Sequence, residues 1–328
     1  MSYIRNLVSM AVLSTGSAVV LLSQSAFAET VNLRFSWKLK GEYAFFYLGK
    51  NKGIYRDAGI DVNLGEGAGA QSALAAVVQG REDLAVVPGI FAITAIQKGM
   101  PVKIVALYQP AAPVVLLSHQ ESPVEKPADL EGKSIASAVG ETSTAYLDVF
   151  CSRNRIDCSK IKKINMDSQI RISQFMQGKV DVVGVYRTSD LPLLKEKTGS
   201  NFAVLDLPEF GLVVPGLAVV ARVDAVEKNA AVLRRFFVAT DKAIEMARRE
   251  PDAATAALKT VWQVGPSDAI VREQVEATSR SIPAAAAKPL GWIEDSAISD
   301  AVRLIAAVED IGAPRPPASF YTNELLAR

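Results

Sequence analysis

The sequence is poor in the residues on which many catalytic and metal sites depend. It has two cysteines and one histidine in 328 residues. The histidine, His119, lies well away from both cysteines, and no spacing typical of metal ligands is present. The chain also has no glycine-rich phosphate loop and no serine motif of the G-x-S-x-G type. We therefore expect no metal, no cofactor and no enzymatic activity.

Long apolar runs and an excess of one charge are also lacking. Residues 1–28 combine Arg5, a mostly apolar run over Met10–Leu22 and the small-residue motif Ala26–Ala28. This pattern predicts a secretory signal cleaved after Ala28, with a retained amphipathic anchor as the alternative. Without Arg5 the 36 basic residues become 35, equal to the 35 acidic residues. A neutral chain gives no support for nucleic acid or an anionic membrane surface as partner.

The two cysteines, Cys151 and Cys158, both follow the predicted signal. The signal itself has no cysteine for lipidation, which favours a soluble periplasmic protein. In an oxidising compartment an isolated close pair of cysteines is typical of a disulfide. We expect this bridge to tie the end of a helix to the loop that follows it.

Two segments share one pattern, which indicates an internal duplication. AQSALAAVVQGREDLAVVP (70–88) and SQIRISQFMQGKVDVVGVY (168–186) align without gaps. Each is typical of a helix that ends in Gln-Gly, followed by a basic residue, any residue, an aspartate and a buried strand. Gly80 and Gly178 stand where a residue after a helix adopts the left-handed conformation at little cost. Because a strand-like run precedes each segment, we predict one βαβ unit in each of two lobes.

The order of the predicted elements favours an α/β protein. Strands alternate with helices up to Ala221, as in α/β layers with mainly parallel sheets, and the pattern from Asp224 onward is helical. The apolar runs Pro113–Ser118 and Val214–Ala221 are the expected crossings between the lobes. We predict that residues 29–111 and 223–328 form lobe 1, that residues 112–222 form lobe 2, and that a cleft separates them.

Four stretches, in their order along the chain, carry a family resemblance. They are Trp37 followed by EYAFFYLGKNKGIYRDAGIDVNL, then GAGAQSALAAVVQGREDLAVV, KPADLEGKSIASAVGETSTAYL and FMQGKVDVVGVY. Together they cover most of Val31–Ala221, and in this the chain resembles the periplasmic substrate-binding proteins of bacterial ABC importers. The similar branch contains nitrate, alkanesulfonate, taurine and thiamine-pyrimidine-precursor binders.

The resemblance implies a two-lobed Venus-flytrap fold, the type II periplasmic-binding-protein fold with two hinge crossings. It implies a monomer that closes on a small organic ligand, anionic or heterocyclic, and delivers it to an ABC permease with its ATPase. A periplasmic ligand sensor is one alternative. An enzyme similar to the pyrimidine synthases of this fold is another.

Ligand groups in lobe 1 should come from loops at the carboxyl ends of its strands. The indole of Trp37 either stacks on a ligand or caps the core of the lobe. The loop Gly65–Gln71 is either an ordinary glycine turn or a place where backbone amides approach the ligand. The candidates in this lobe are Trp37, Tyr43, Glu66, Ala70, Gln71, Pro88 and Gly89.

The candidates in lobe 2 are Glu141, Thr142, Ser143, Tyr186 and Arg187. We predict a helix over Thr142–Arg155 with Thr142 or Ser143 as its cap, and its first amides are suited to an anion. Capping alone also explains these residues. Arg187 is placed to pair with a carboxylate or sulfonate, with a solvated arginine at the rim as the alternative.

Two acidic candidates leave the charge of the ligand open. Glu66 and Glu141 each lie in a loop that would otherwise offer amides to an anion. A carboxylate that faces an anionic ligand in a closed cleft costs several kcal/mol, roughly, unless it is screened. The two side chains either point outward or accept hydrogen bonds from an amine or amide of a heterocycle.

Overall fold

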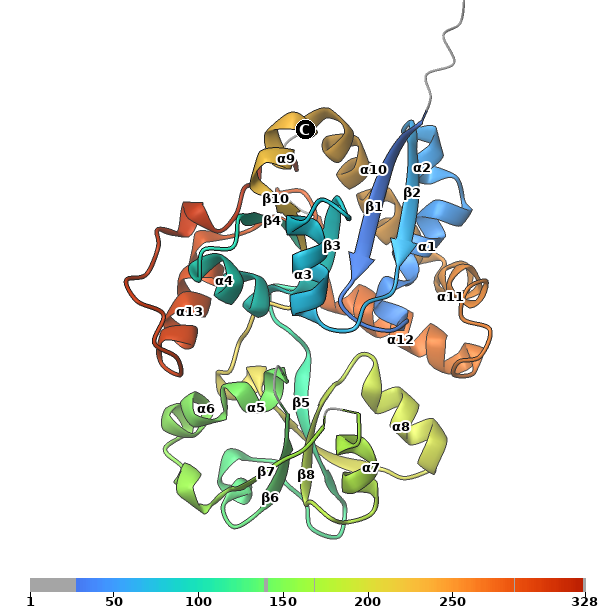
Figure 1. Ribbon diagram of the computed structural model, residues 1–328. Helices are drawn as coiled ribbons and strands as arrows, with labels where there is room; N and C mark the ends of the chain where they lie inside the picture. The colour runs from blue at the N-terminus through green and yellow to red at the C-terminus, as the bar shows by residue number, and fades with distance from the viewer. Residues whose placement is uncertain (1–27, 139–140, 168, 286, 327–328) are drawn as a thin grey trace, which may run out of the picture.

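The computed structural model describes residues 28–138, 141–167, 169–285 and 287–326, so the predicted signal upstream of residue 28 lies outside these ranges. The described chain forms two lobes, each built on one five-stranded sheet (Figure 1). The larger lobe carries both the N-terminal strands and the C-terminal helices. The smaller lobe is formed by the middle of the chain.

The first lobe has the strand order β2-β1-β3-β10-β4. Strands β1, β2 and β3 run parallel, and β10 runs antiparallel to both β3 and β4. The strands are β1 (Glu29–Phe35), β2 (Ile60–Gly65), β3 (Leu84–Pro88), β4 (Val102–Leu107) and β10 (Leu217–Arg222). The helices are η1 (Gly41–Tyr43), α1 (Ala44–Asn51), α2 (Ile54–Asp57), α3 (Ala70–Val78), α4 (Gly89–Gln97), α9 (Val223–Lys228), α10 (Ala230–Arg249), α11 (Pro251–Lys259), α12 (Asp268–Ser281), α13 (Asp295–Ala306) and η5 (Pro317–Ser319).

The second lobe has the strand order β7-β6-β8-β5-β9. Strands β6, β7 and β8 run parallel, and β5 runs antiparallel to β8 and β9. The strands are β5 (Val114–His119), β6 (Ser134–Ser137), β7 (Lys162–Asn165), β8 (Val182–Tyr186) and β9 (Phe202–Asp206). The helices are η2 (Pro127–Leu130), α5 (Thr142–Ala145), α6 (Leu147–Asn154), η3 (Cys158–Lys160), α7 (Arg171–Met176), α8 (Asp190–Thr198) and η4 (Pro208–Phe210).

The predicted duplication is confirmed by the topology. The units β2-α3-β3 and β7-α7-β8 occupy equivalent places in the two sheets. Gly80 and Gly178 follow the two helices with φ of 70° and 67°, the left-handed conformation that the sequence predicts. In each sheet the antiparallel strand is the one that has just arrived from the other lobe, β10 in the first and β5 in the second.

This arrangement moves one predicted boundary. The prediction placed Leu217–Arg222 in lobe 2, yet this strand pairs with β3 and β4 in the first sheet. The second crossing therefore precedes β10. An apolar strand buried on both faces fits either sheet, so its residues alone do not determine its lobe.

The predicted helix over Thr142–Arg155 is also corrected, because it is two helices. Tyr146 has non-helical backbone angles (φ −114°, ψ 18°) and separates α5 from α6. Its side chain is buried, which fixes the break against the core.

The C-terminal helices cover the first lobe. The helical pattern predicted for this region is confirmed, and the buried face of α10 includes Phe236, Phe237 and Ile244. Helix α12 lies on the side of the first lobe that faces the second, where it contacts α8 (Figure 1). Within the described ranges, no helix combines the length and the apolar character needed to span a membrane.

Candidate functional site

The two lobes meet at a cluster of polar and aromatic side chains. We call this the interlobe cluster, and it consists of Lys40, Glu42 and Tyr43 of the first lobe and Tyr186 and Asp190 of the second. Lys40 Nζ lies 5.0 Å from the centroid of the Tyr186 ring and 3.9 Å from Glu42 Oε1. The side chains of Lys40 and Glu42 are only 18% and 8% exposed, so contact between the lobes removes both from solvent.

Helix η1 places the first-lobe half of the cluster. Strand β1 ends at Phe35, whose ring stacks on Tyr43 with centroids 4.1 Å apart. This stacking holds the polar turn between strand and helix against the core, so Lys40 and Glu42 are carried at the carboxyl end of β1. Figure 1 shows β1 and β2 pointing toward the second lobe. Ligands of open α/β sheets bind at this end of the strands.

Strand β8 places the second-lobe half. Tyr186 ends the strand, and its backbone N–H donates to Asp190 Oδ2 at 2.9 Å. The Tyr186 hydroxyl lies 3.5 Å from Thr142 Oγ1. The hydroxyls of Thr188 and Ser189 are buried and have no hydrogen-bond partner among the described residues. The turn between β8 and α8 therefore concentrates polar groups at the lobe boundary.

Burial controls the protonation of the interlobe cluster. It raises the pKa of Glu42 above its ordinary value, and the Asp190 carboxyl adds to this while Lys40 opposes it. Burial acts to lower the pKa of Lys40, but Glu42, Asp190 and Tyr186 together hold it above its ordinary value. Burial also raises the pKa of Tyr186 to about 12, against a hydrogen bond with Thr142. Burial and the neighbouring Asp190 therefore favour the protonated form of Glu42, and the three neighbouring groups favour the charged form of Lys40.

The carboxylate of Glu141 occupies the helix amides that the sequence predicted to be suited to an anion. Its two carboxylate oxygens accept from the backbone amides of Ser143 (2.9 Å) and Thr144 (3.1 Å), and from the hydroxyls of both residues. The cap of α5 is thus Glu141, where Thr142 or Ser143 was predicted. Arg171 Nη1 lies 3.8 Å from the same carboxylate. The first amides of this helix are bound to the protein's own carboxylate.

Arg187 is engaged in the same way. Its guanidinium pairs with Asp206 at 2.5 Å, and its side chain is 46% exposed. The backbone N–H of Arg187 donates to Pro113 in the first crossing. Arg187 is therefore a partly exposed side chain paired within the second lobe.

The remaining first-lobe candidates lie outside the contacts of the interlobe cluster. Trp37 is half-buried, and its carbonyl accepts from the Gly67 N–H at 3.2 Å. Glu66 lies 3.4 Å from Lys38 Nζ and is 38% exposed. Gly89 donates to the Gly216 carbonyl at 2.5 Å, so it packs on the second crossing. Ala70 and Pro88 are half-buried, and Gln71 is exposed.

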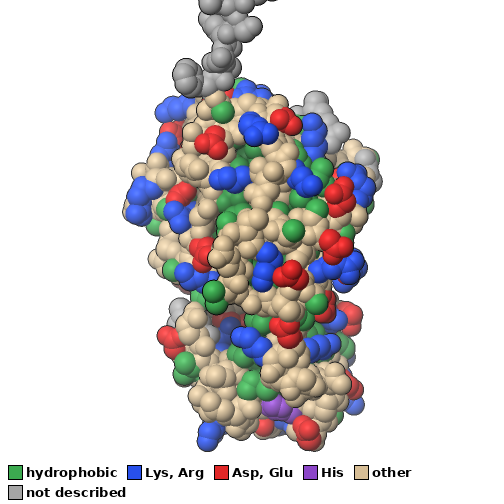
Figure 2. Space-filling model, turned by 90° about the vertical axis from the view of Figure 1, so that its right-hand side faces the viewer, with side chains coloured by type: hydrophobic (Ala, Val, Ile, Leu, Met, Phe, Trp, Pro, Cys, Tyr) green, Lys and Arg blue, Asp and Glu red, His purple; other side chains and the backbone are tan. Residues whose placement is uncertain are grey.

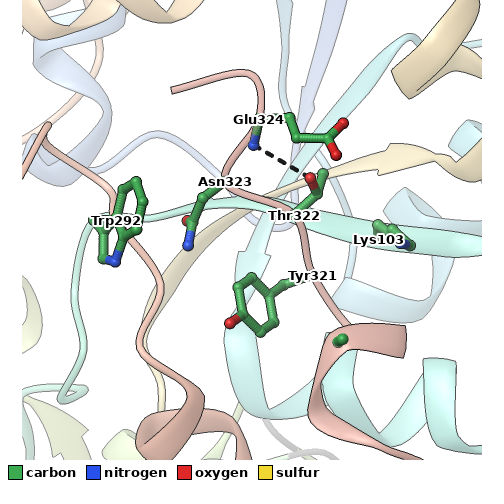
Figure 3. A pocket seen from close by; sticks show the side chains of 7 residues that line it. Lys103, Trp292, Tyr321, Thr322, Asn323 and Glu324 are labelled. Carbon is green, nitrogen blue, oxygen red and sulfur yellow. Dashed lines mark hydrogen bonds between the residues drawn. The ribbon is translucent and has the colours of Figure 1, made fainter. Parts of the chain in front are cut away.

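Two surface hollows lie on the first lobe. One, of about 450 Å³, lies beside Lys103 and Trp292 (Figure 3). Two of its polar side chains are already used, because the Tyr321 hydroxyl donates to Asp295 and the Asn323 carboxamide bonds twice to Ile293. The other, of about 510 Å³, is lined by first-lobe residues with the ion pairs Arg34–Glu82 and Lys38–Glu66. Neither hollow is lined by a residue of the second lobe.

Reasoning from the sequence missed several residues that meet at the lobe boundary. Lys40 and Glu42 are near in sequence to Tyr43, which was a predicted site residue. The signal that could have identified them is a lysine and a glutamate next to a buried aromatic turn. Gln274 lies on the buried face of α12 with Val271, Val275 and Thr278, and a polar residue on such a face was its signal. Nothing in the sequence singles out Asp190.

The disulfide prediction is confirmed. Cys151 in α6 is bonded to Cys158 in η3, with Cα atoms 5.6 Å apart. The bridge ties a helix end to the following loop and lies away from the interlobe cluster. Among the described residues there is no group of three or more side chains suited to hold a metal ion.

Comparisons with known proteins agree with the geometry. The family described as NMT1/THI5 like matches residues 40–254, more than half of the 328 residues. The chain belongs to the NMT1/THI5-like family. One curated relative is the formylaminopyrimidine-binding protein of Halalkalibacterium halodurans, which is 25% identical over 238 residues, or 71% of this chain and 70% of the relative.

Solved structures similar to this member of the NMT1/THI5-like family show its fold. One is the alkanesulfonate-binding protein SsuA of Xanthomonas axonopodis pv. citri, bound to MOPS, with a TM-score of 0.67 and 16% sequence identity. The match covers 89% of this chain and 98% of the SsuA chain. The periplasmic aliphatic sulphonate binding protein SsuA of Escherichia coli has a TM-score of 0.67 and 18% sequence identity. The match covers 85% of this chain and 86% of that SsuA chain. The protein has the two-lobed periplasmic-binding-protein fold.

Proposed function

We propose that this protein captures a small nitrogen-bearing heterocycle, neutral or cationic, at the interlobe cluster and delivers it to an ABC permease with its ATPase. The observation that carries the proposal is the charge of the cluster. Two carboxyl groups, Glu42 and Asp190, meet a single ammonium group, Lys40, across the lobe boundary. Such a site offers carboxyl oxygens to amine and amide donors, and its one ammonium, already beside Glu42, is the only cation of the cluster for a sulfonate.

Two of the groups that could instead bind an anion are already bound. The α5 amides hold Glu141, and the Arg187 guanidinium holds Asp206. An anionic ligand would have to displace a carboxylate from one of these positions. The relative named as a formylaminopyrimidine-binding protein supports the same ligand class.

A binding role, without catalysis, is part of the proposal. His119 stacks on Phe175 with centroids 4.3 Å apart, and its Nε2 lies 3.0 Å from the Phe175 carbonyl oxygen. This histidine therefore supports the second sheet and lies outside the interlobe cluster.

Calorimetric titration tests the ligand class. Protein comprising residues 29–328, refolded to remove any carried ligand, is titrated with aminopyrimidines and with alkanesulfonates of similar size. We expect aminopyrimidines to bind, the Asp190→Asn variant to lose at least tenfold in affinity, and the control Glu66→Gln to bind as the wild type does. Binding of sulfonates alone would overturn the ligand class. Loss of binding in the Glu66 variant but not in the Asp190 variant would overturn the site.

We also propose that the protein is exported to the periplasm, cleaved after Ala28, and works as a monomer. Export is supported by the sequence of residues 1–28 and by the periplasmic location named for its structural neighbours. Surface charges support a monomer, since acidic and basic side chains alternate over the face drawn in Figure 2. The intact mass of protein from a periplasmic extract checks the cleavage site, and light scattering checks the oligomeric state.

A further inference from the structure

Helix α12 of the first lobe is bonded to the second lobe by the side chain of Gln274. Gln274 is 2% exposed, and its Nε2 donates to the Ser189 carbonyl at 2.7 Å. Its Oε1 accepts from the Gly41 N–H at 2.9 Å. The same carboxamide therefore binds the turn that carries Lys40 and the turn that carries Asp190.

The end of α12 is fixed to the hinge. The Ser281 hydroxyl accepts from Gln109 Nε2 at 2.7 Å, and Gln109 lies in the first crossing. The Gln109 carbonyl in turn accepts from Gly216 N–H of the second crossing at 2.8 Å. One helix thus bonds at its end to Gln109, which in turn bonds to the second crossing, and bonds in its middle to the second lobe.

The fit at Gln274 is close. A Cβ atom added to Gly41 would overlap Gln274 Cβ and lie 3.1 Å from the Gln274 backbone carbon. A side chain at residue 41 would therefore push α12 away from η1. Glycine at this position allows the carboxamide to reach both of its partners.

We propose that Gln274 is a positioning residue, a clasp that holds the lobes together in the absence of ligand and aligns the two halves of the interlobe cluster. The inference builds on the proposed function, because it assigns a role to a residue next to the proposed ligand site. It concerns the lobe arrangement and does not depend on which ligand binds. One hydrogen bond of average net strength should shift the ratio of closed to open protein roughly fivefold.

Small-angle X-ray scattering of the ligand-free protein tests the clasp. Gln274→Glu is nearly isosteric and keeps an acceptor for Gly41, but it sets a carboxylate oxygen against the Ser189 carbonyl. Gln274→Ala removes both bonds. The exposed neighbour Glu273 supplies the control, Glu273→Gln. We expect both Gln274 variants to have a larger radius of gyration than the wild type, with unchanged circular dichroism, and the control to match the wild type.

Each other outcome overturns the clasp. If both Gln274 variants scatter as the wild type does, the lobes are held by other contacts. If only Gln274→Ala opens, the bond to Ser189 is not the one that holds them. If the ligand-free wild type is already as open as the variants, no clasp acts without ligand. None of these results bears on whether aminopyrimidines bind, so the clasp and the proposed function fail separately.

Discussion

Gly184 in strand β8 is the position where one added methyl group best tests the role of Glu141 as a cap. A Cβ atom at residue 184 would overlap Ser143 Oγ and lie 2.5 Å from Ser143 Cβ and 2.8 Å from Glu141 Oε1. Gly184→Ala must therefore displace Ser143 and pull the carboxylate from the α5 amides. The change therefore disturbs close packing that only a residue without a side chain allows at this position of the strand.

The expected cost follows from three contributions. Overpacking costs about 1–3 kcal/mol, and losing the hydroxyl bond to a charged group costs about 1.5–3 kcal/mol. Replacing glycine within a strand returns about 0.5–1 kcal/mol. The free energy of unfolding should thus fall by about 2–5 kcal/mol, as measured by urea denaturation followed by circular dichroism.

Gly65→Ala is the matched control. Its new Cβ would meet the end of the Arg34 side chain, 2.6 Å from Nη1, so only the far end of a long side chain, paired with Glu82, has to shift. We expect its cost to stay below about 1 kcal/mol. The double variant Gly184→Ala/Ser143→Gly should cost less than the sum of its parts, because the glycine removes the overlapping atoms. A Gly184→Ala protein within about 0.5 kcal/mol of the wild type would refute the packing argument.

Three further predictions concern charge and the disulfide. Burial raises the pKa of Glu42 above 4.5, so its contribution to stability is present below that pH and is lost as pH rises through the raised pKa. The stability of the wild type relative to Glu42→Gln should fall as the pH rises above 4.5 in urea titrations, and a rise would contradict the burial argument. Replacing Cys151 and Cys158 with serine should cost about 2.5 kcal/mol in the chain-entropy model, because the bridge closes a short loop, and a calorimetric melt without any loss would contradict it. Arg187→Gln should lower stability by less than about 1 kcal/mol, since its pair with Asp206 is partly exposed, and aminopyrimidine titration should be unchanged; weaker binding would place Arg187 at the ligand.

Much of the fold followed from local patterns in the sequence. The Gln-Gly helix ends at Gly80 and Gly178 and the apolar strands after them predicted two equivalent units, because helix termination and strand burial are local properties. The disulfide followed from the spacing of two cysteines. The lobe of β10 did not follow, since its pairing with β3 and β4 joins segments that are far apart in the chain.

For the candidate site too, some features follow from local sequence and others from contacts between distant segments. The sequence by itself determined that Tyr43 lies in the turn after the first strand, that Tyr186 ends the strand of the second repeat, and that a helix begins at Thr142. Only the tertiary structure decided that Lys40 faces the Tyr186 ring and that Gln274, from a distant helix, bonds to Ser189. Only it decided that Glu141 and Asp206 occupy the groups suited to an anion. Strands and caps depend on neighbours in the chain, whereas the charge of the interlobe cluster depends on which segments the fold brings together.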